Sequence, residues 1–314
     1  MGQRLDPSHR LGSSRPPGQV RKVARKVGRV RASLVRRAWL RTTFLLTPPL
    51  AWFLVIYLAS LVIMLITSLW SVNSFTQTID HTITTQNFHQ IATGAYPKII
   101  LRTVLLAAVV TVTDVVLAFP FAYLMARVAR QRTQRLLLVA VLLPLWASYL
   151  AKVYAWISIL EKGGTVNWAF TKLGLAAPNL GFTNTAMWIA FTYLWLPYMI
   201  VPVYGALERI PNSLLEASYD LGGSGWTTMR RVVLPLALPG LVAGSIFTFS
   251  LTLGDYVTPL LVGGANSTLI GNAIYENLLT GGNLPLAAAL ATVPIAIMVV
   301  YLIVAKRLGA FEAL

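Results

Sequence analysis

The sequence of 314 residues contains no cysteine and only three histidines. Without cysteine, the chain can form neither a disulfide scaffold nor a thiolate metal site, and it has no cysteine nucleophile. Acidic residues are also scarce, with ten aspartates and glutamates against 26 lysines and arginines. Because 56% of the residues are hydrophobic, the composition excludes an ordinary soluble domain and indicates a membrane protein.

The sequence also lacks the motifs that bind nucleotides. It contains no GxxxxGK[ST] phosphate-binding loop and no dinucleotide-binding signature, so the chain cannot bind ATP in the usual way. Asp80, His81 and His89 could hold a metal ion, but their polar stretch is more simply an exposed loop. We therefore expect no metal site, no cofactor and no catalytic site in this chain.

Positive charge clusters in the first 41 residues and in short segments between apolar runs. This distribution is typical of membrane topology and not of a nucleic-acid-binding face, so no nucleic-acid partner is expected. From about Gln19, apolar residues recur at helical spacing among the basic residues of the tail 1–41. The pattern predicts an amphipathic helix on anionic lipid of the inner leaflet. The alternative is a basic cytosolic tail that only fixes the orientation.

Six apolar runs follow within residues 42–314, each close to the roughly 20 residues that a helix needs to cross the hydrocarbon core. They cover residues 43–70, 100–126, 136–160, 185–207, 236–262 and 284–305. Backbone polar groups find no water inside a membrane, so these runs must be helices. The sequence therefore predicts an all-α polytopic membrane protein with six transmembrane helices.

The basic residues between the runs predict the orientation. They gather in the tail, in residues 127–135, in residues 209–231 and at residues 306–307. By the positive-inside rule, these segments and both termini lie in the cytosol.

Three connections are then left on the opposite side. Residues 71–99 are polar and are expected to cover the outer mouth of the protein. Residues 161–184 are expected to contain a short interfacial helix around Trp168. Residues 263–285 are Gly-rich but half apolar, which favours a partly buried or re-entrant segment.

The cytosolic segment 208–235 is polar and broken by glycine. Residues 214–221 are predicted to form a short helix that Gly222 ends, because the residue just past a helix often needs a positive φ. A second helix is predicted to begin near Ser224 or Thr227 and to be closed by Pro235.

The spacing in this segment resembles the EAA loop of ABC-importer membrane subunits, which reads Glu-Ala-Ala, three residues, Gly, nine residues, Ile-x-Leu-Pro. The matching residues are Glu216, Ala217, Ser218, Gly222, Val232, Leu234 and Pro235. Serine replaces the second alanine and valine replaces the isoleucine, and both changes are small. The resemblance implies a type I ABC importer permease subunit, in which this loop forms the coupling helix that docks on a cytosolic ATPase.

The resemblance also implies the partners. They are a second, homologous permease, two ATPase subunits that bind ATP and Mg²⁺, and an extracytoplasmic substrate-binding protein, assembled in a bacterial plasma membrane. This chain would then supply half of the translocation path and one coupling helix, and would be no enzyme by itself.

Asp255 is the sharpest candidate for a substrate contact. It lies in the stretch SLTLGDYVTPLLVGG, where Gly254 and Pro259 interrupt the fifth run. Its carboxylate and the ring of Tyr256 could together hold an ammonium group. The alternative is a structural carboxylate that pairs with a neighbouring helix or loop. The stretch resembles the Gly-Asp/Glu-aromatic-Val-x-Pro segment of spermidine/putrescine-type permeases, which implies a polyamine substrate.

Other polar and aromatic residues fall at membrane depth, where they usually face a cavity or a partner. The further path candidates are Trp146, Tyr149, Tyr193, Trp195 and, as a second cation ligand on the outer side, Glu276. Asp114 lies in the middle of the second run. We expect a structural role for it, through Thr111, Thr113 or a partner subunit, in preference to a role in the path.

Two other functions fit less well. A secondary transporter driven by an ion gradient would need intramembrane charge pairs and inverted repeats, whereas the sequence shows two deep acids and no clear repeat. A membrane enzyme would need a convergent polar site, yet all three histidines lie outside the apolar runs. Within importers, iron(III) or an oxyanion is the alternative substrate, although Lys152 is the single deep cation that could serve an anion.

Overall fold

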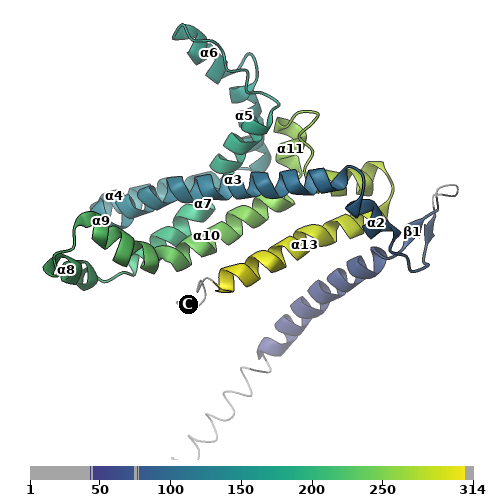
Figure 1. The fold of residues 1–314 in the computed structure, drawn as a ribbon, viewed down its shortest axis with the longest axis horizontal. Helices are drawn as coiled ribbons and strands as arrows, with labels where there is room; N and C mark the ends of the chain where they lie inside the picture. The colour runs from purple at the N-terminus through teal and green to yellow at the C-terminus, as the bar shows by residue number, and fades with distance from the viewer. Residues whose placement is uncertain (1–42, 44, 74–75, 77, 308–314) are drawn as a thin grey trace, which may run out of the picture. The chain divides into compact units, whose positions relative to one another are not determined.

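A computed structural model describes residue 43 and residues 45–73, 76 and 78–307. The predicted tail helix of residues 1–41 lies outside these residues. The chain divides into two compact units, Met1–Ile63 and Met64–Leu314, and the sites below all belong to the second. The described residues are overwhelmingly helical, which confirms the all-α fold class (Figure 1).

Four of the six predicted spans are found as single helices long and apolar enough to cross a membrane. They are Leu45–Thr67, Tyr96–Val128, Asn184–Glu208 and Leu284–Arg307. The second of these consists of α3 (Tyr96–Tyr123) and a π turn, η1 (Leu124–Val128), while the third and fourth are α7 and α13.

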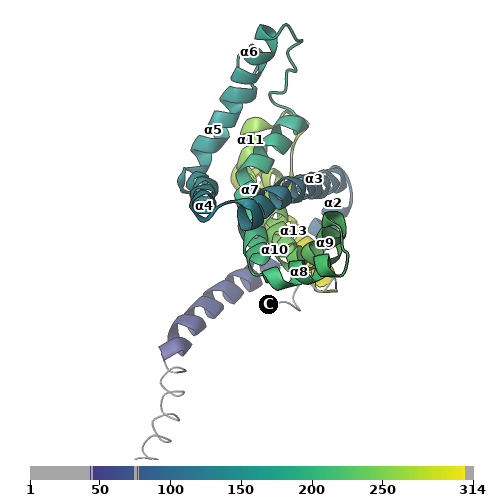
Figure 2. The same cartoon turned by 90° about the vertical axis from the view of Figure 1, so that its left-hand side faces the viewer.

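The predicted third span, residues 136–160, is not one continuous helix. It is divided into α4 (Gln131–Trp146) and α5 (Tyr149–Leu160), and α6 (Thr165–Lys172) continues beyond α5. The two arms are bent by 95°, and Figure 2 shows the corner between α4 and α5. Ala147 and Ser148 adopt extended backbone conformations there, with ψ of 144° and 132°. Counted as one broken span, the pair brings the candidate spans of the described residues to six.

The helix observed for the predicted fifth span, residues 236–262, begins and ends at other residues than predicted. It begins far earlier and runs from Gly225 to Gly254, through α9 (Gly225–Thr228), the π turn η2 (Met229–Val233) and α10 (Leu234–Gly254). Pro235 therefore does not close the second helix of the polar loop, and that prediction is wrong. Proline lacks an N–H and breaks the regular i→i−4 pattern, and here the wider π turn just before it accommodates the loss.

At its C-terminal end this helix stops at Gly254, as the Gly254–Pro259 interruption predicts, and a short α11 (Val257–Val262) follows. The connection after it contains α12 (Ile270–Tyr275) and the π turn η3 (Glu276–Thr280). Most of α12 is buried, which confirms the prediction of a partly buried segment. Its Gly271 lies so close to the break that an added Cβ would be 2.5 Å from the carbonyl oxygen of Asp255.

The other two connections that were predicted on the outer side contain only short elements. Residues 71–99 contain the antiparallel pair β1 (Ser71–Val72) and β2 (Ile79–Asp80), in which Ser71 is opposite Asp80, and then α2 (Gln86–Ala92). Helix α6 confirms the short helix predicted around Trp168. Among the described residues, no group of three or more acidic or histidine side chains could hold a metal ion.

Helices α3, α7 and α10 pack together as the centre of the second unit (Figure 1). Close approach of α7 and α10 depends on glycine, since small residues let helix backbones meet. A Cβ added at Gly240 would lie 2.5 Å from Cβ of Ala206 and 2.6 Å from the carbonyl oxygen of Pro202.

We therefore expect Gly240→Ala to destabilise the folded protein by about 1–3 kcal/mol, the usual cost of overpacking. Thermal unfolding in detergent measures the effect. Gly205→Ala on α7 is the matched control, because its Cβ would meet no atom within 4 Å. If the two variants unfold at the same temperature, the contact between α7 and α10 is not as tight as described.

Candidate functional site

The loop predicted to contact an ATPase is a helical hairpin. Its first arm, α8, spans Asn212–Asp220, and Gly222 follows with φ of 80°, which confirms glycine as the residue that ends the helix. The second arm begins with α9, and the Ser224 hydroxyl accepts a hydrogen bond of 3.3 Å from the backbone N–H of Thr227. Ser224 is thus the N-cap of α9, and the second helix begins near Ser224, as predicted.

Ser218, which departs from the EAA pattern, ties the two arms together. Its hydroxyl lies 2.8 Å from that of Thr228, and its carbonyl accepts a 2.8 Å hydrogen bond from the N–H of Gly223. An alanine at position 218 would lack the hydroxyl contact. The serine therefore adds rigidity to the hairpin.

The hairpin presents an exposed apolar surface together with Glu216. Every residue of α8 is at least partly exposed, and Glu216 and Ala217 face solvent. The large exposed apolar side chains are Leu214, Tyr219, Leu221 and Trp226. Apolar surface of this kind on a loop is typical of a protein–protein contact. Val232, Leu234 and Pro235, the other end of the motif, lie in η2 and in the first turn of α10.

Arg127 fixes the base of this hairpin. From the π turn η1, it donates hydrogen bonds of 2.5 Å to the carbonyl oxygens of Leu207 and Ile210. It also donates one of 2.8 Å to Oδ1 of Asn212, the first residue of α8. The guanidinium thus joins the end of α3, the end of α7 and the start of the hairpin. The sequence analysis counted Arg127 only as a topological charge and missed this role.

Asp255 lies at the break between α10 and α11, and four donors surround its carboxylate. Oδ1 accepts from the backbone N–H groups of Val257 at 2.8 Å and Thr258 at 3.3 Å. Oδ2 accepts from the hydroxyl of Thr258 at 2.8 Å and from the hydroxyl of Tyr149. A carboxylate has about four acceptor positions, so in this conformation it ties α5 to the start of α11. No lysine or arginine of the described residues pairs with it.

The aromatic candidates form two groups around Asp255. The ring of Tyr149 stacks on Trp195 with centroids 6.0 Å apart, and Trp195 in turn meets Tyr198 edge-on at 5.9 Å. On the other side, Tyr256 stacks on Tyr275 at 4.8 Å. The structure therefore brings Tyr149, Trp195 and Tyr256 to the same place as Asp255.

The remaining candidates lie elsewhere. Trp146 ends α4 and is 91% exposed, while Tyr193 contacts Trp156 edge-on at 5.3 Å. Glu276 is exposed at the start of η3. None of these three has a contact with Asp255 among the described residues.

Asp114 is fully buried in α3, and neither of its carboxylate oxygens has a hydrogen-bond partner within the described residues. The predicted bonds to Thr111 and Thr113 are not formed. The Thr111 hydroxyl bonds instead to the carbonyl of Ala107 at 2.7 Å, and that of Thr113 bonds to the carbonyl of Val109 at 2.8 Å.

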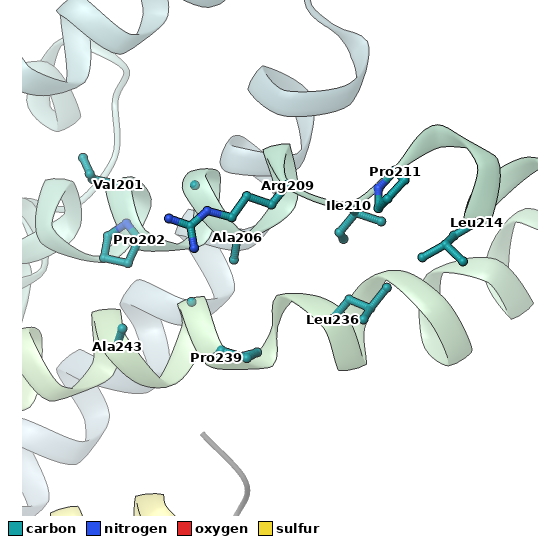
Figure 3. Close-up of a pocket in the computed structure, with 12 residues that line it drawn as sticks. Val201, Pro202, Ala206, Arg209, Ile210, Pro211, Leu214, Leu236, Pro239 and Ala243 are labelled. Carbon is teal, nitrogen blue, oxygen red and sulfur yellow. The ribbon is translucent and has the colours of Figure 1, made fainter. Parts of the chain in front are cut away.

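A groove of about 470 Å³ lies between α7 and α10 at the base of the hairpin (Figure 3). The residues that line it from these two helices are Val201, Pro202, Gly205, Ala206, Leu236, Pro239, Gly240 and Ala243. Arg209 extends back along α7 past Ala206 (Figure 3), and it pairs with no acid of the described residues. The sequence signal for this groove, small residues facing each other on two spans, was overlooked.

Comparison with known proteins identifies the chain. Residues 118–310 match the family described as binding-protein-dependent transport system inner membrane component. The chain belongs to this family. The permease is 44% identical over 283 residues to the inner membrane ABC transporter permease protein YdcU of Escherichia coli (strain K12), which covers 86% of this chain and 90% of that relative. It is 31% identical to the spermidine/putrescine transport system permease protein PotB of Haemophilus influenzae, over 67% of this chain and 73% of the relative.

Solved structures agree on the fold of the permease. A chain of the bacterial alginate ABC transporter, crystallised with its alginate pentasaccharide-bound periplasmic protein, superposes with a TM-score of 0.72 at 17% identity. The match covers 90% of the permease and 97% of that chain. The inward-facing MetNI methionine ABC transporter gives a TM-score of 0.54 at 18% identity, over 74% of the permease and all of that chain. By its family and its relatives, the permease is a multi-pass inner membrane transport subunit and not an enzyme.

Proposed function

We propose that the permease forms half of the translocation path of an ABC importer for a polyamine such as putrescine or spermidine. Its partners would be a second homologous permease, two ATPase subunits and an extracytoplasmic binding protein. The family description, with its dependence on a binding protein, supports the last of these. The relatives named as spermidine/putrescine permeases support the substrate.

The observation that carries the substrate proposal is the uncompensated charge of Asp255. Its two carboxylate oxygens accept hydrogen bonds from four uncharged donors, and no lysine or arginine of the described residues lies against them. A cation nearby is stabilised by this charge and by the faces of Tyr256 and Tyr275. Since the carboxylate is already fully bonded, the cargo would contact the rings directly and feel Asp255 mainly through its field.

A continuous line of residues supports a path from this point to the opposite side. It begins at Asp255 and Tyr149 and passes through the ring contacts of Tyr149 with Trp195 and of Trp195 with Tyr198. Val201, which lines the α7–α10 groove, is three residues beyond Tyr198 and so on the same face of α7. The groove continues past Arg209 to Leu214 in the coupling hairpin.

The coupling hairpin, residues 208–235, is proposed to dock on an ATPase in the cytosol. Glu216 and the exposed apolar side chains would form the contact, and Arg127 would pass movement between the hairpin and the spans α3 and α7. This role requires both termini in the cytosol, as the positive-inside rule predicts. The basic tail 1–41 would then bind anionic lipid of the inner leaflet.

Uptake by the purified complex in proteoliposomes, with the binding protein outside and ATP inside, tests this function. We expect ATP-dependent uptake of labelled putrescine or spermidine and none of sulfate or molybdate. Uptake of an oxyanion or iron(III) in place of a polyamine would overturn the substrate. Uptake that needs an ion gradient and no ATPase would overturn the importer itself.

Asp255→Asn should lower polyamine uptake at least about tenfold, equal to about 1.4 kcal/mol, because it removes the charge that attracts the cation. Asp80→Asn removes the same charge from an exposed position and should leave uptake unchanged. Initial rates over a range of polyamine concentrations measure both. Equal uptake by the Asp255→Asn complex and the wild type would show that the carboxylate acts only as a structural tie.

A further inference from the structure

A second groove, of about 420 Å³, runs along the first half of α3. One end is lined by three donors of hydrogen bonds, Lys98, Arg102 and Asn184, and the rest is apolar, with Leu101, Leu105 and Val109. The groove shares no lining residue with the Asp255 cluster, the coupling hairpin or the α7–α10 groove. The functions proposed for those sites therefore do not explain the lining of this groove.

The charges at this end have no counterpart in the protein. Lys98 and Arg102 pair with no acid of the described residues, and the hydrogen bond that Arg102 donates, to the carbonyl of Thr268, is long at 3.5 Å. Asn184 accepts a 2.8 Å hydrogen bond from the hydroxyl of Ser267, which leaves its amide N–H groups available. Lys98, Arg102 and Asn184 thus offer hydrogen-bond donors to the groove, which is the arrangement that binds an anion.

These cations do not serve the helix that carries them. Helix α3 begins at Tyr96, so Lys98 lies in its first turn and Arg102 one turn later. The positive end of a helix dipole disfavours a cation in the first turn, where Lys98 lies. The positive-inside rule also predicts few cations at this end of the span. Two cations on this stretch of α3, neither paired with an acid of the described residues, indicate a ligand.

The length of the apolar part fits one leaflet of a bilayer. From Lys98 to Val109 the helix rises about 16 Å, at 1.5 Å per residue, and half of a hydrocarbon core of ~30 Å is about the same. Leu101, Leu105 and Val109 are exposed along this stretch. An acyl chain that starts next to the two cations would lie along these three apolar side chains and reach the middle of the membrane.

We propose that this groove is a binding site for an anionic phospholipid. The phosphate lies between Lys98 and Arg102, with the amide of Asn184 as a further donor, and an acyl chain lies along Leu101, Leu105 and Val109. Two cations favour a headgroup of net negative charge, such as phosphatidylglycerol, over a zwitterionic one. The site does not depend on the identity of the cargo.

Native mass spectrometry of the purified transport complex, titrated with phosphatidylglycerol or phosphatidylcholine, tests the proposal. We expect phosphatidylglycerol to be retained, and Lys98→Gln/Arg102→Gln to weaken its binding at least about fivefold. Lys162→Gln/Lys172→Gln is the matched control, because it removes the same charge from residues outside the groove and should not weaken binding. Lys98→Arg/Arg102→Lys keeps both charges and should retain the lipid, which separates loss of the site from loss of the fold.

Three results would overturn the proposal. The first is unchanged phosphatidylglycerol binding in the Lys98→Gln/Arg102→Gln complex. The second is equal retention of glycerol phosphate, which has the headgroup anion without an acyl chain and would show a site for free phosphate. The third is no difference between phosphatidylglycerol and phosphatidylcholine, which would show that the groove takes bulk lipid without regard to charge.

Discussion

Gly222→Val is expected to lower ATP-driven transport at least about tenfold while the protein still inserts into the membrane. Gly222 has a φ of 80°, a conformation that is strained for a β-branched residue and costs of order 1–3 kcal/mol. No atom lies within 4 Å of the position that a Cβ would take, so the effect comes from the backbone alone. The relaxed backbone would turn α8 away from α9 and displace Glu216, which we propose contacts the ATPase.

Uptake and ATP hydrolysis by the complex, measured together, show whether the two activities are uncoupled. Gly225→Ala is the control, because it lies three residues later, also has free space for a Cβ, and has no positive φ. It should transport normally. Normal transport by Gly222→Val would mean that the hairpin geometry is not needed for coupling.

Arg127→Ala is expected to have an effect of similar size through a different cause. It removes the three hydrogen bonds to Leu207, Ile210 and Asn212, and bonds from a charged donor contribute about 1.5–3 kcal/mol each. The carbonyls at the end of α7 would lose their partner, and the hairpin would lose its attachment to α3. Transport should fall at least tenfold, with ATP hydrolysis no longer stimulated by the loaded binding protein.

Two further variants separate the geometry of Arg127 from its charge. Arg130→Ala removes the same charge from the same connection, at an exposed position, and should keep transport. Arg127→Lys keeps the charge but lacks the planar fork that reaches three acceptors, so it should remain defective. Full activity of Arg127→Lys would show that charge alone is required.

The sequence predicted well where one physical effect dominates. The span 185–207 is found as Asn184–Glu208, because hydrophobicity over some 20 residues decides whether a helix can cross a membrane. Gly222 was predicted to end α8 for a backbone reason that needs no knowledge of the surroundings. The family followed from the spacing around Glu216 and is confirmed by the match to residues 118–310.

Prediction was wrong where two local signals compete. Pro235 usually ends a helix, but the π turn η2 absorbs the missing hydrogen bond, and the helix continues to Gly254. The corner at Ala147 and Ser148 has no glycine or proline at the break itself, and Pro144, three residues earlier, lies inside α4 without ending it. In both cases the position of a proline did not predict where the helix ends.

The sequence analysis named residues of the candidate site but not the hydrogen bonds that join them. Asp255 and Tyr149 were both named, yet their hydrogen bond joins residues 106 positions apart, which a single sequence cannot reveal. The same holds for Arg127 and its partners 80 or more residues away. Contacts of this range appear only once α3, α7 and α10 are packed.

Photo-crosslinking from the coupling hairpin tests the central claim most directly. Benzoylphenylalanine replaces Leu221, which is 89% exposed between α8 and α9, and in a second protein replaces Leu173, which is 74% exposed beyond α6. Irradiation of the purified complex and mass spectrometry of the adducts identify the neighbour of each position. The account predicts an ATPase adduct from position 221 and none from position 173. An intact complex that contains the ATPase but gives no ATPase adduct at position 221 would contradict it.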